Sequence, residues 1–177
     1  MTGFWKGLFF MGNQRKMSKA LIKHLREEGV GCRLENDVII FEFGDCNFVV
    51  AFILHEDCAE CVMSYSCGED KYEALDMPDK TFIADNANVE NENHCVAVAY
   101  NDVLVVRTSF YFTSKRMMLG LFSRHFEELI ESVRTALGLV YEKISRQKAY
   151  KNRTIGFNAV PVTPPSTQTD CIKSLRR

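Results

Sequence analysis

Three consecutive segments with a hydrophobic period of two, joined by very short connections, constrain the fold of this chain most strongly. In the first segment, Ile39, Phe41 and Phe43 alternate with Val38, Ile40 and Glu42, and similar alternation runs through residues 47–54 and 61–66. A period of two is typical of a strand, because successive side chains point to opposite faces. The connections are too short for the crossovers that parallel strands require. The sequence therefore predicts an antiparallel meander.

Helical spacing flanks this meander on both sides. Before it, apolar residues recur every three or four positions between residues 13 and 28, and Gly29 is placed to end that helix. After it, a second helix is predicted to begin at Pro78. This helix is expected to be weak, because its many asparagines disfavour a helix interior. A long amphipathic helix closes the domain and continues toward Ile144. Its apolar residues are spaced 3, 4, 3, 4, 3, 4: Leu119, Phe122, Phe126, Leu129, Val133, Ala136 and Val140.

Two further strands are predicted at residues 94–100 and 103–112, joined by Asn101 and Asp102, which suit a type I′ hairpin. The predicted order is α-βββ-α-ββ-α. We therefore expect an α+β domain with a five-stranded antiparallel sheet and helices on one face. This domain is expected to span residues 13–150.

Residues 1–12 are predicted to form an N-terminal extension that contains Trp5, Leu8 and Phe9. They are read as a packing element, as an interfacial anchor, or as sequence upstream of a start at Met11 or Met17. Residues 151–177 are basic and then rich in Pro and Thr, and we expect them to form a disordered tail.

The element order and several local patterns resemble the YbjN family, whose domain shares the fold of type III secretion chaperones. The resemblance covers roughly residues 13–145. It rests on the helix end at residues 26–29, the strands at 38–43 and 48–53, the Asn-rich segment 84–88, the hairpin 95–112 and the closing helix. What the resemblance implies is a non-enzymatic, often dimeric domain that binds protein segments or regulates, with no shared catalytic residues.

Charge is segregated along the chain although the net charge is −1. Residues 1–34 carry +5, residues 35–93 carry −13 and residues 94–177 carry +7. Two interpretations stay open: compensation within one fold, or an acidic face that steers a basic partner. No concentrated basic face is indicated, so nucleic acid is not an expected partner. No apolar run approaches the roughly 18 residues that span a bilayer, so integral membrane association is not expected either.

The most chemically suggestive cluster is His55, Cys58 and Cys61, with Cys67 beyond it. Four such ligands suit a tetrahedral zinc ion, and a Cys-x-x-Cys pair also suits thiol redox chemistry. Against both, Cys61 and Cys67 share the parity of one strand face, and no Gly or Pro turns the backbone around an ion. Ordinary strand packing is the preferred interpretation, so we predict no metal-binding residue and no cofactor.

No phosphate loop, nucleophile elbow or metalloprotease motif occurs in the sequence, so we predict no catalytic residue and no enzyme. The seven cysteines show no disulfide framework, and reduced thiols indicate a cytoplasmic protein. Thirteen Phe residues, and rings on both faces of the strand around Tyr111, favour binding of a protein or peptide segment. The length of the closing helix predicts a homodimer.

Overall fold

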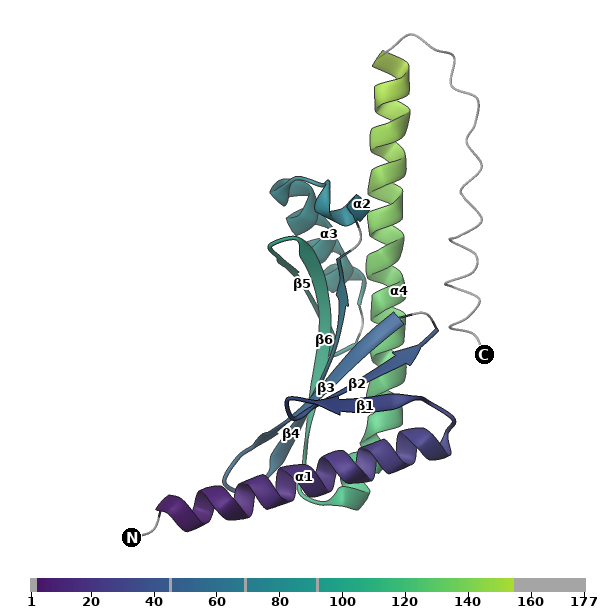
Figure 1. Cartoon of the computed structure of the whole chain (residues 1–177). Helices are drawn as coiled ribbons and strands as arrows, with labels where there is room; N and C mark the ends of the chain where they lie inside the picture. Colours follow the sequence, from purple (N-terminus) through teal and green to yellow (C-terminus); the bar gives the residue numbers. More distant parts are fainter. Residues whose placement is uncertain (1–2, 45, 69, 92, 155–177) are drawn as a thin grey trace. The chain divides into compact units, whose positions relative to one another are not determined.

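The computed structural model describes residues 3–44, 46–68, 70–91 and 93–154. The elements follow one another in this order: α1 (Gly3–Glu27), β1 (Cys32–Glu35), β2 (Val38–Phe43), β3 (Cys46–Leu54), β4 (Ala59–Cys67), α2 (Asp70–Glu73), α3 (Met77–Glu90), β5 (Val96–Tyr100), β6 (Val103–Phe112) and α4 (Lys115–Thr154). The mixed α+β class with an open antiparallel sheet is confirmed (Figure 1).

The chain divides into two compact units. Unit 1 contains Met1–Tyr65 and Arg107–Leu129, and unit 2 contains Ser66–Val106 and Ile130–Arg177. The long elements β4, β6 and α4 each contribute residues to both units.

The sheet has six strands in the order β1-β2-β3-β4-β6-β5, so the predicted five strands and the predicted element order are wrong. The additional strand is β1, which pairs with β2 from Cys32 opposite Phe41 to Glu35 opposite Val38. Asn36 and Asp37 both have positive φ, as a tight type I′ hairpin requires. The sequence marks this turn, but the four residues before it lack an alternating apolar pattern. At residues 101 and 102, where the sequence predicts a type I′ turn, only Asn101 has positive φ.

Aromatic packing around Phe126 forms the core of unit 1. The Phe126 ring of α4 lies 5.0 Å from Phe48 and 5.3 Å from Phe41, measured between ring centroids. Phe41 and Phe48 also stack on each other at 5.6 Å, across paired positions of β2 and β3. Side chains alternate between buried and more exposed along β3 and β4, so one sheet face carries this core.

Helix α1 confirms the predicted helix and its end. Leu21 and Leu25 are buried, and Gly29 has a φ of 79°, which favours glycine at a helix C-terminus. The Val30 N–H donates to the Leu25 carbonyl at 2.8 Å and closes the last turn. The helix begins at Gly3, so residues 3–12 continue it toward the N-terminus. Their side chains lie outside the described residues.

In unit 2, helix α3 begins as Pro78 predicts. Asp76 is the N-cap, and its carboxylate accepts from the Asp79 N–H at 2.9 Å. The second half of α4 holds α3 through Lys143, whose Nζ lies 2.5 Å from the Asp79 carboxylate. This contact joins a basic segment to an acidic one, as the compensating interpretation of the charge pattern predicts. The short helix α2, with Tyr72 buried, lies in a segment that the sequence indicates only as a polar loop.

Helix α4 keeps its apolar stripe covered within one chain. In its second half, which belongs to unit 2, Leu137 and Val140 are buried, and Tyr141 and Ile144 are half-buried. The helix length therefore no longer requires a second copy. The helix also extends to Thr154, so the predicted tail does not begin at residue 151; residues 155–177 lie outside the description. Among the described helices, none has both the length and the apolar character needed to cross a bilayer.

Replacement of Phe48 tests the aromatic core of unit 1. Phe48→Ala leaves a cavity beside Phe41, Tyr65 and Phe126, and we expect a loss of about 3–5 kcal/mol in the free energy of unfolding. Urea denaturation measures it. The matched control is the exposed ring Tyr111, whose replacement by alanine should cost about 0.5 kcal/mol or less. Equal losses for the two variants would contradict this description of the core.

Candidate functional site

The predicted His55–Cys58 cluster lies at the hairpin between β3 and β4, in unit 1. The His55 N–H donates to the Cys58 carbonyl at 2.9 Å, which closes the turn. The His55 side chain contacts two residues of the same chain. Its Nε2 lies 3.4 Å from Glu60 Oε2, and its ring lies 5.6 Å from that of Tyr111, measured between centroids. The imidazole therefore contacts the Glu60 carboxylate and the Tyr111 ring at the surface.

Cys61 and Cys67 lie on the buried face of β4, as strand packing predicts. Burial raises the pKa of the Cys61 thiol far above its usual range, and the neighbouring Glu60 carboxylate adds to the rise. A thiolate is the form that binds zinc or attacks a disulfide. The environment of Cys61 therefore opposes both chemistries.

A small hollow of about 160 Å³ adjoins this hairpin and includes Cys58 but not Cys61. Its lining comprises Met17, Leu54, His55, Glu56, Asp57, Cys58, Ala59, Phe112 and Thr113. In the described ranges of the chain, no three His, Cys, Asp or Glu residues gather closely enough to hold a metal ion. Zinc binding or redox use of His55, Cys58, Cys61 and Cys67 stays an untested alternative.

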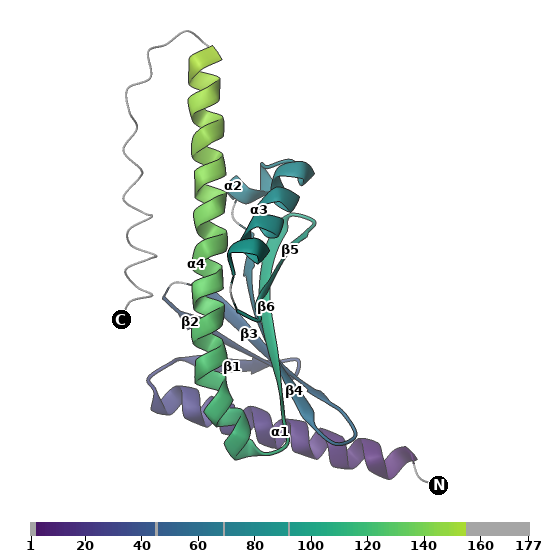
Figure 2. The ribbon, with the colours of Figure 1, turned by 180° about the vertical axis from the view of Figure 1, so that it is seen from behind.

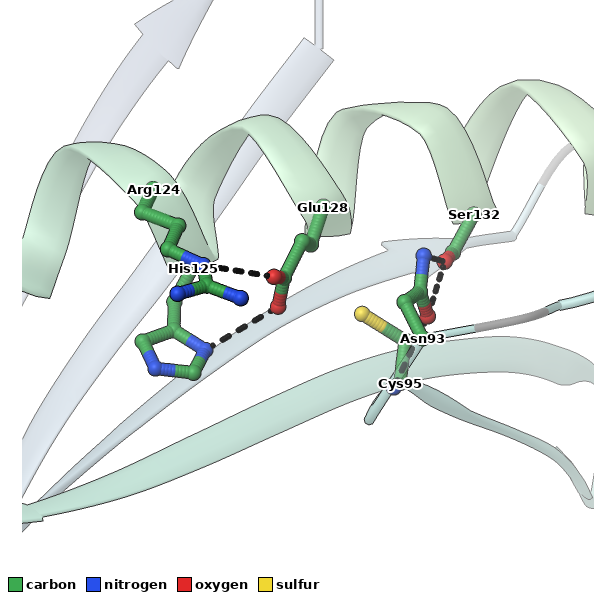
Figure 3. A network of polar contacts seen from close by, with 6 residues as sticks. All are labelled: Asn93, Cys95, Arg124, His125, Glu128 and Ser132. Carbon is green, nitrogen blue, oxygen red and sulfur yellow. Dashed lines mark hydrogen bonds and ion pairs between the residues drawn. The ribbon is translucent and has the colours of Figure 1, made fainter.

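A polar network in unit 1 involves a histidine that the sequence does not single out (Figure 3). Glu128 accepts from the Arg124 Nε at 3.2 Å, and its other oxygen lies 3.1 Å from His125 Nδ1. His125 also stacks on Phe110, with ring centroids 4.8 Å apart. Its charged sequence neighbours favour an exposed histidine, but the structure places His125 half-buried, where it packs α4 against β6.

A second network, in unit 2, joins the segment before β5 to α4 (Figure 3). The Asn93 amide and the Ser132 hydroxyl make two contacts, of 2.9 and 3.1 Å. The Asn93 side-chain oxygen also accepts from the Cys95 N–H at 3.0 Å. Asn93 thus fixes the start of β5, and Ser132 is satisfied although it is completely buried.

Strand β5 is an edge of the sheet, and a side chain from α3 closes the middle of that edge. The Asn88 Nδ2 donates to the Ala97 carbonyl at 2.9 Å, and the Ala97 N–H donates to Asn88 Oδ1 at 2.6 Å. In an antiparallel pair, the N–H and C=O of one residue point to the same side. The amide of Asn88 therefore occupies the place that a partner strand would take at Ala97.

Helix α3 also holds the loop after β5. Lys80 is almost completely buried, and its Nζ lies 3.1 Å from Asp102 Oδ1 and 5.4 Å from the centre of the Tyr72 ring. Burial, with a smaller effect of Cys67, raises the pKa of Tyr72 to about 12. The phenol stays neutral at physiological pH, so the Lys80 charge is met by Asp102. Together with Asn88, this contact attaches the β5–β6 hairpin to α3.

The other face of the β5–β6 hairpin is apolar and exposed. Val96, Val98 and Tyr100 are 44%, 38% and 64% exposed, whereas the intervening Ala97 is buried on the side of α3. In the neighbouring strand β6, Val103 and Val105 lie on the less buried face, because Leu104 and Val106 are buried on the opposite face. Both of these β6 valines are half-buried. We call these five residues the hairpin face.

Sequence reasoning missed the closed edge and the hairpin face. The asparagines of α3 were read only as poor helix formers, although an amide that offers both a donor and an acceptor is suited to a free strand edge. The alternation from Val96 to Tyr100 predicts a strand, but it does not tell which face is covered. The sequence does carry one signal for the exposed face: residues 96–100 are all apolar, with no polar residue at alternate positions to form an ordinary solvent-facing side.

A scan against models of protein families matches none, and neither the curated proteins nor the solved structures contain a match to this chain. The likeness to the YbjN family therefore stays a prediction.

Thiol labelling tests the description of the hairpin cysteines. In the native protein at neutral pH, we expect the half-buried Cys58 to react with iodoacetamide much faster than Cys61, because burial keeps the Cys61 thiol protonated. Peptide mass spectrometry identifies the labelled residues, and urea-unfolded protein is the control in which both react. Rapid native labelling of Cys61, or stoichiometric zinc lost in Cys61→Ser, would instead support the zinc and redox alternative.

Proposed function

We propose that this chain is a non-enzymatic, cytoplasmic protein-binding module of the YbjN or secretion-chaperone type. It docks a protein or peptide segment on the hairpin face of unit 2. The observation that carries this proposal is the exposure of Val96, Val98 and Tyr100 together on one side of an edge strand.

An outward sheet face in an antiparallel protein usually carries polar residues. The hairpin face instead offers two exposed valines and a tyrosine, and tyrosine is enriched where proteins meet. Removal of these side chains from water on binding would be favourable, at about 25 cal/mol for each Å² of apolar surface. The hairpin that presents them is fixed by Asn88 and Lys80, so little ordering is needed when a partner binds.

The closed edge indicates how the partner is bound. A peptide that added a strand to β5 would need the Ala97 N–H and C=O, and both already bond to Asn88. The partner is therefore bound through side-chain contacts on the hairpin face. A second copy of the chain can provide such contacts, and this is how the proposal includes a homodimer.

Selection from a displayed peptide library tests the proposal. Peptides selected on the full chain should lose at least about tenfold in affinity against Val98→Ser/Tyr100→Ser, because two central apolar contacts are removed. Isothermal titration calorimetry measures the affinity. The control is Val89→Ser, which changes the most exposed large apolar residue of α3 and should bind as the parent does.

Sedimentation velocity of the same proteins separates the kinds of partner. A parent dimer that becomes a monomer in Val98→Ser/Tyr100→Ser, but not in Val89→Ser, assigns the hairpin face to self-association. Circular dichroism establishes that the variants are folded. The proposal is overturned if no peptide is selected and the parent is a monomer, or if selected peptides bind the double variant and the parent equally.

A further inference from the structure

The solvent-facing side of helix α1 carries a continuous row of cations. Arg15, Lys16, Lys19, Lys23 and Arg26 are all exposed. Four of them, from Lys16 to Arg26, follow one another at spacings of 3, 4 and 3, which places them on one face of the helix. The buried residues of α1, Ser18, Leu21 and Leu25, lie on the opposite face. We call these five cations the basic stripe.

Little within α1 neutralises the basic stripe. The sequence of α1 contains a single acidic residue, Glu27. Its carboxylate lies 3.6 Å from the Lys23 Nζ, and both side chains are largely exposed. An exposed pair of this kind is weak. The stripe thus keeps most of its positive charge available to a partner.

The same helix continues without a break into an aromatic segment. Residues 3–12 are helical and include Phe4, Trp5, Leu8 and Phe9 in the sequence. Both ribbon views show this end of α1 extending past the β3–β4 hairpin (Figures 1 and 2).

We propose that α1 binds an anionic lipid bilayer, lying in the plane of its surface. The basic stripe meets the acidic headgroups, while the aromatic segment enters the boundary between headgroups and acyl chains. Reversible anchoring of a protein on a bilayer generally takes two signals, and an apolar segment next to a polybasic patch supplies both. From position 5 to position 26 the helix is about 30 Å long, so it can contact several headgroups at once.

A nucleic acid would use the cations but has less use for the aromatic segment, whereas Trp and Phe are favoured at a bilayer interface. A bilayer also accepts a straight row of charges on one helix, because its headgroups form a broad anionic surface. These two features make the bilayer the preferred partner. The inference does not depend on the proposed peptide binding, because it concerns another surface of the chain.

Vesicle binding by the full chain tests the inference, with the single tryptophan, Trp5, as the natural probe. We expect binding to vesicles of phosphatidylcholine with about one third phosphatidylserine, and little binding to phosphatidylcholine alone. On binding, the emission of Trp5 should shift to the blue and should be quenched by bromine on the lipid acyl chains. High salt should release the protein.

The charge variant Lys16→Gln/Lys19→Gln/Lys23→Gln should bind these vesicles on the order of 100-fold more weakly, because three exposed cations are removed. The matched control, Lys115→Gln/Arg116→Gln/Lys148→Gln, removes three other exposed cations and should retain most of the affinity. Trp5→Ser/Leu8→Ser, measured by co-sedimentation, should also weaken binding.

Three results would overturn the inference. The first is equal binding to neutral and anionic vesicles, or none to either. The second is an equal loss in the two charge variants, which would assign binding to net charge alone. The third is tight, salt-sensitive binding of a short RNA or DNA duplex without vesicle binding, which would assign the basic stripe to a nucleic acid.

Discussion

The free backbone edge of β5 is the constraint on which the organisation of unit 2 depends. An edge strand exposes N–H and C=O groups that must be satisfied, and it also invites a second chain to pair with it. Asn88 satisfies both groups of Ala97, and Asn93 satisfies the N–H of Cys95. Once α3 is held against this strand, one side of the hairpin is buried beneath a helix. The other side, with Val98 and Tyr100, is left for a partner.

Much of the fold could be predicted because its signals are local and periodic. The meander, the end of the first helix at Gly29 and the long final helix all depend on spacing and on single turn residues. β1 could not be predicted in this way. It is an edge strand of four residues, mostly exposed, so it needs no apolar alternation.

The surfaces were harder to predict than the elements, because they depend on contacts between residues distant in sequence. The sequence identifies Asn88 as a poor helix former. Its role in the fold is its pair of hydrogen bonds with the backbone of Ala97, nine positions away. The charged neighbours of His125 in the sequence favour an exposed side chain, but contacts with Phe110 and Glu128 hold it half-buried. The charge pattern of the sequence likewise does not tell which charges are paired. Lys143 and Asp79 compensate each other within unit 2, while the cations of α1 stay exposed.

The central claim is that the edge of β5 is closed while the hairpin face is open, and amide hydrogen exchange of Ala97 tests it most directly. We expect slow exchange at Ala97 in the parent and exchange at least about tenfold faster in Asn88→Ala, because its acceptor is lost. The Val98 amide points to β6 and should stay protected in both. Asn86→Ala, which removes an amide that donates to the Phe82 carbonyl, is the control and should leave Ala97 unchanged. Fast exchange at Ala97 in the parent, or the same rate in Asn88→Ala, would contradict the claim.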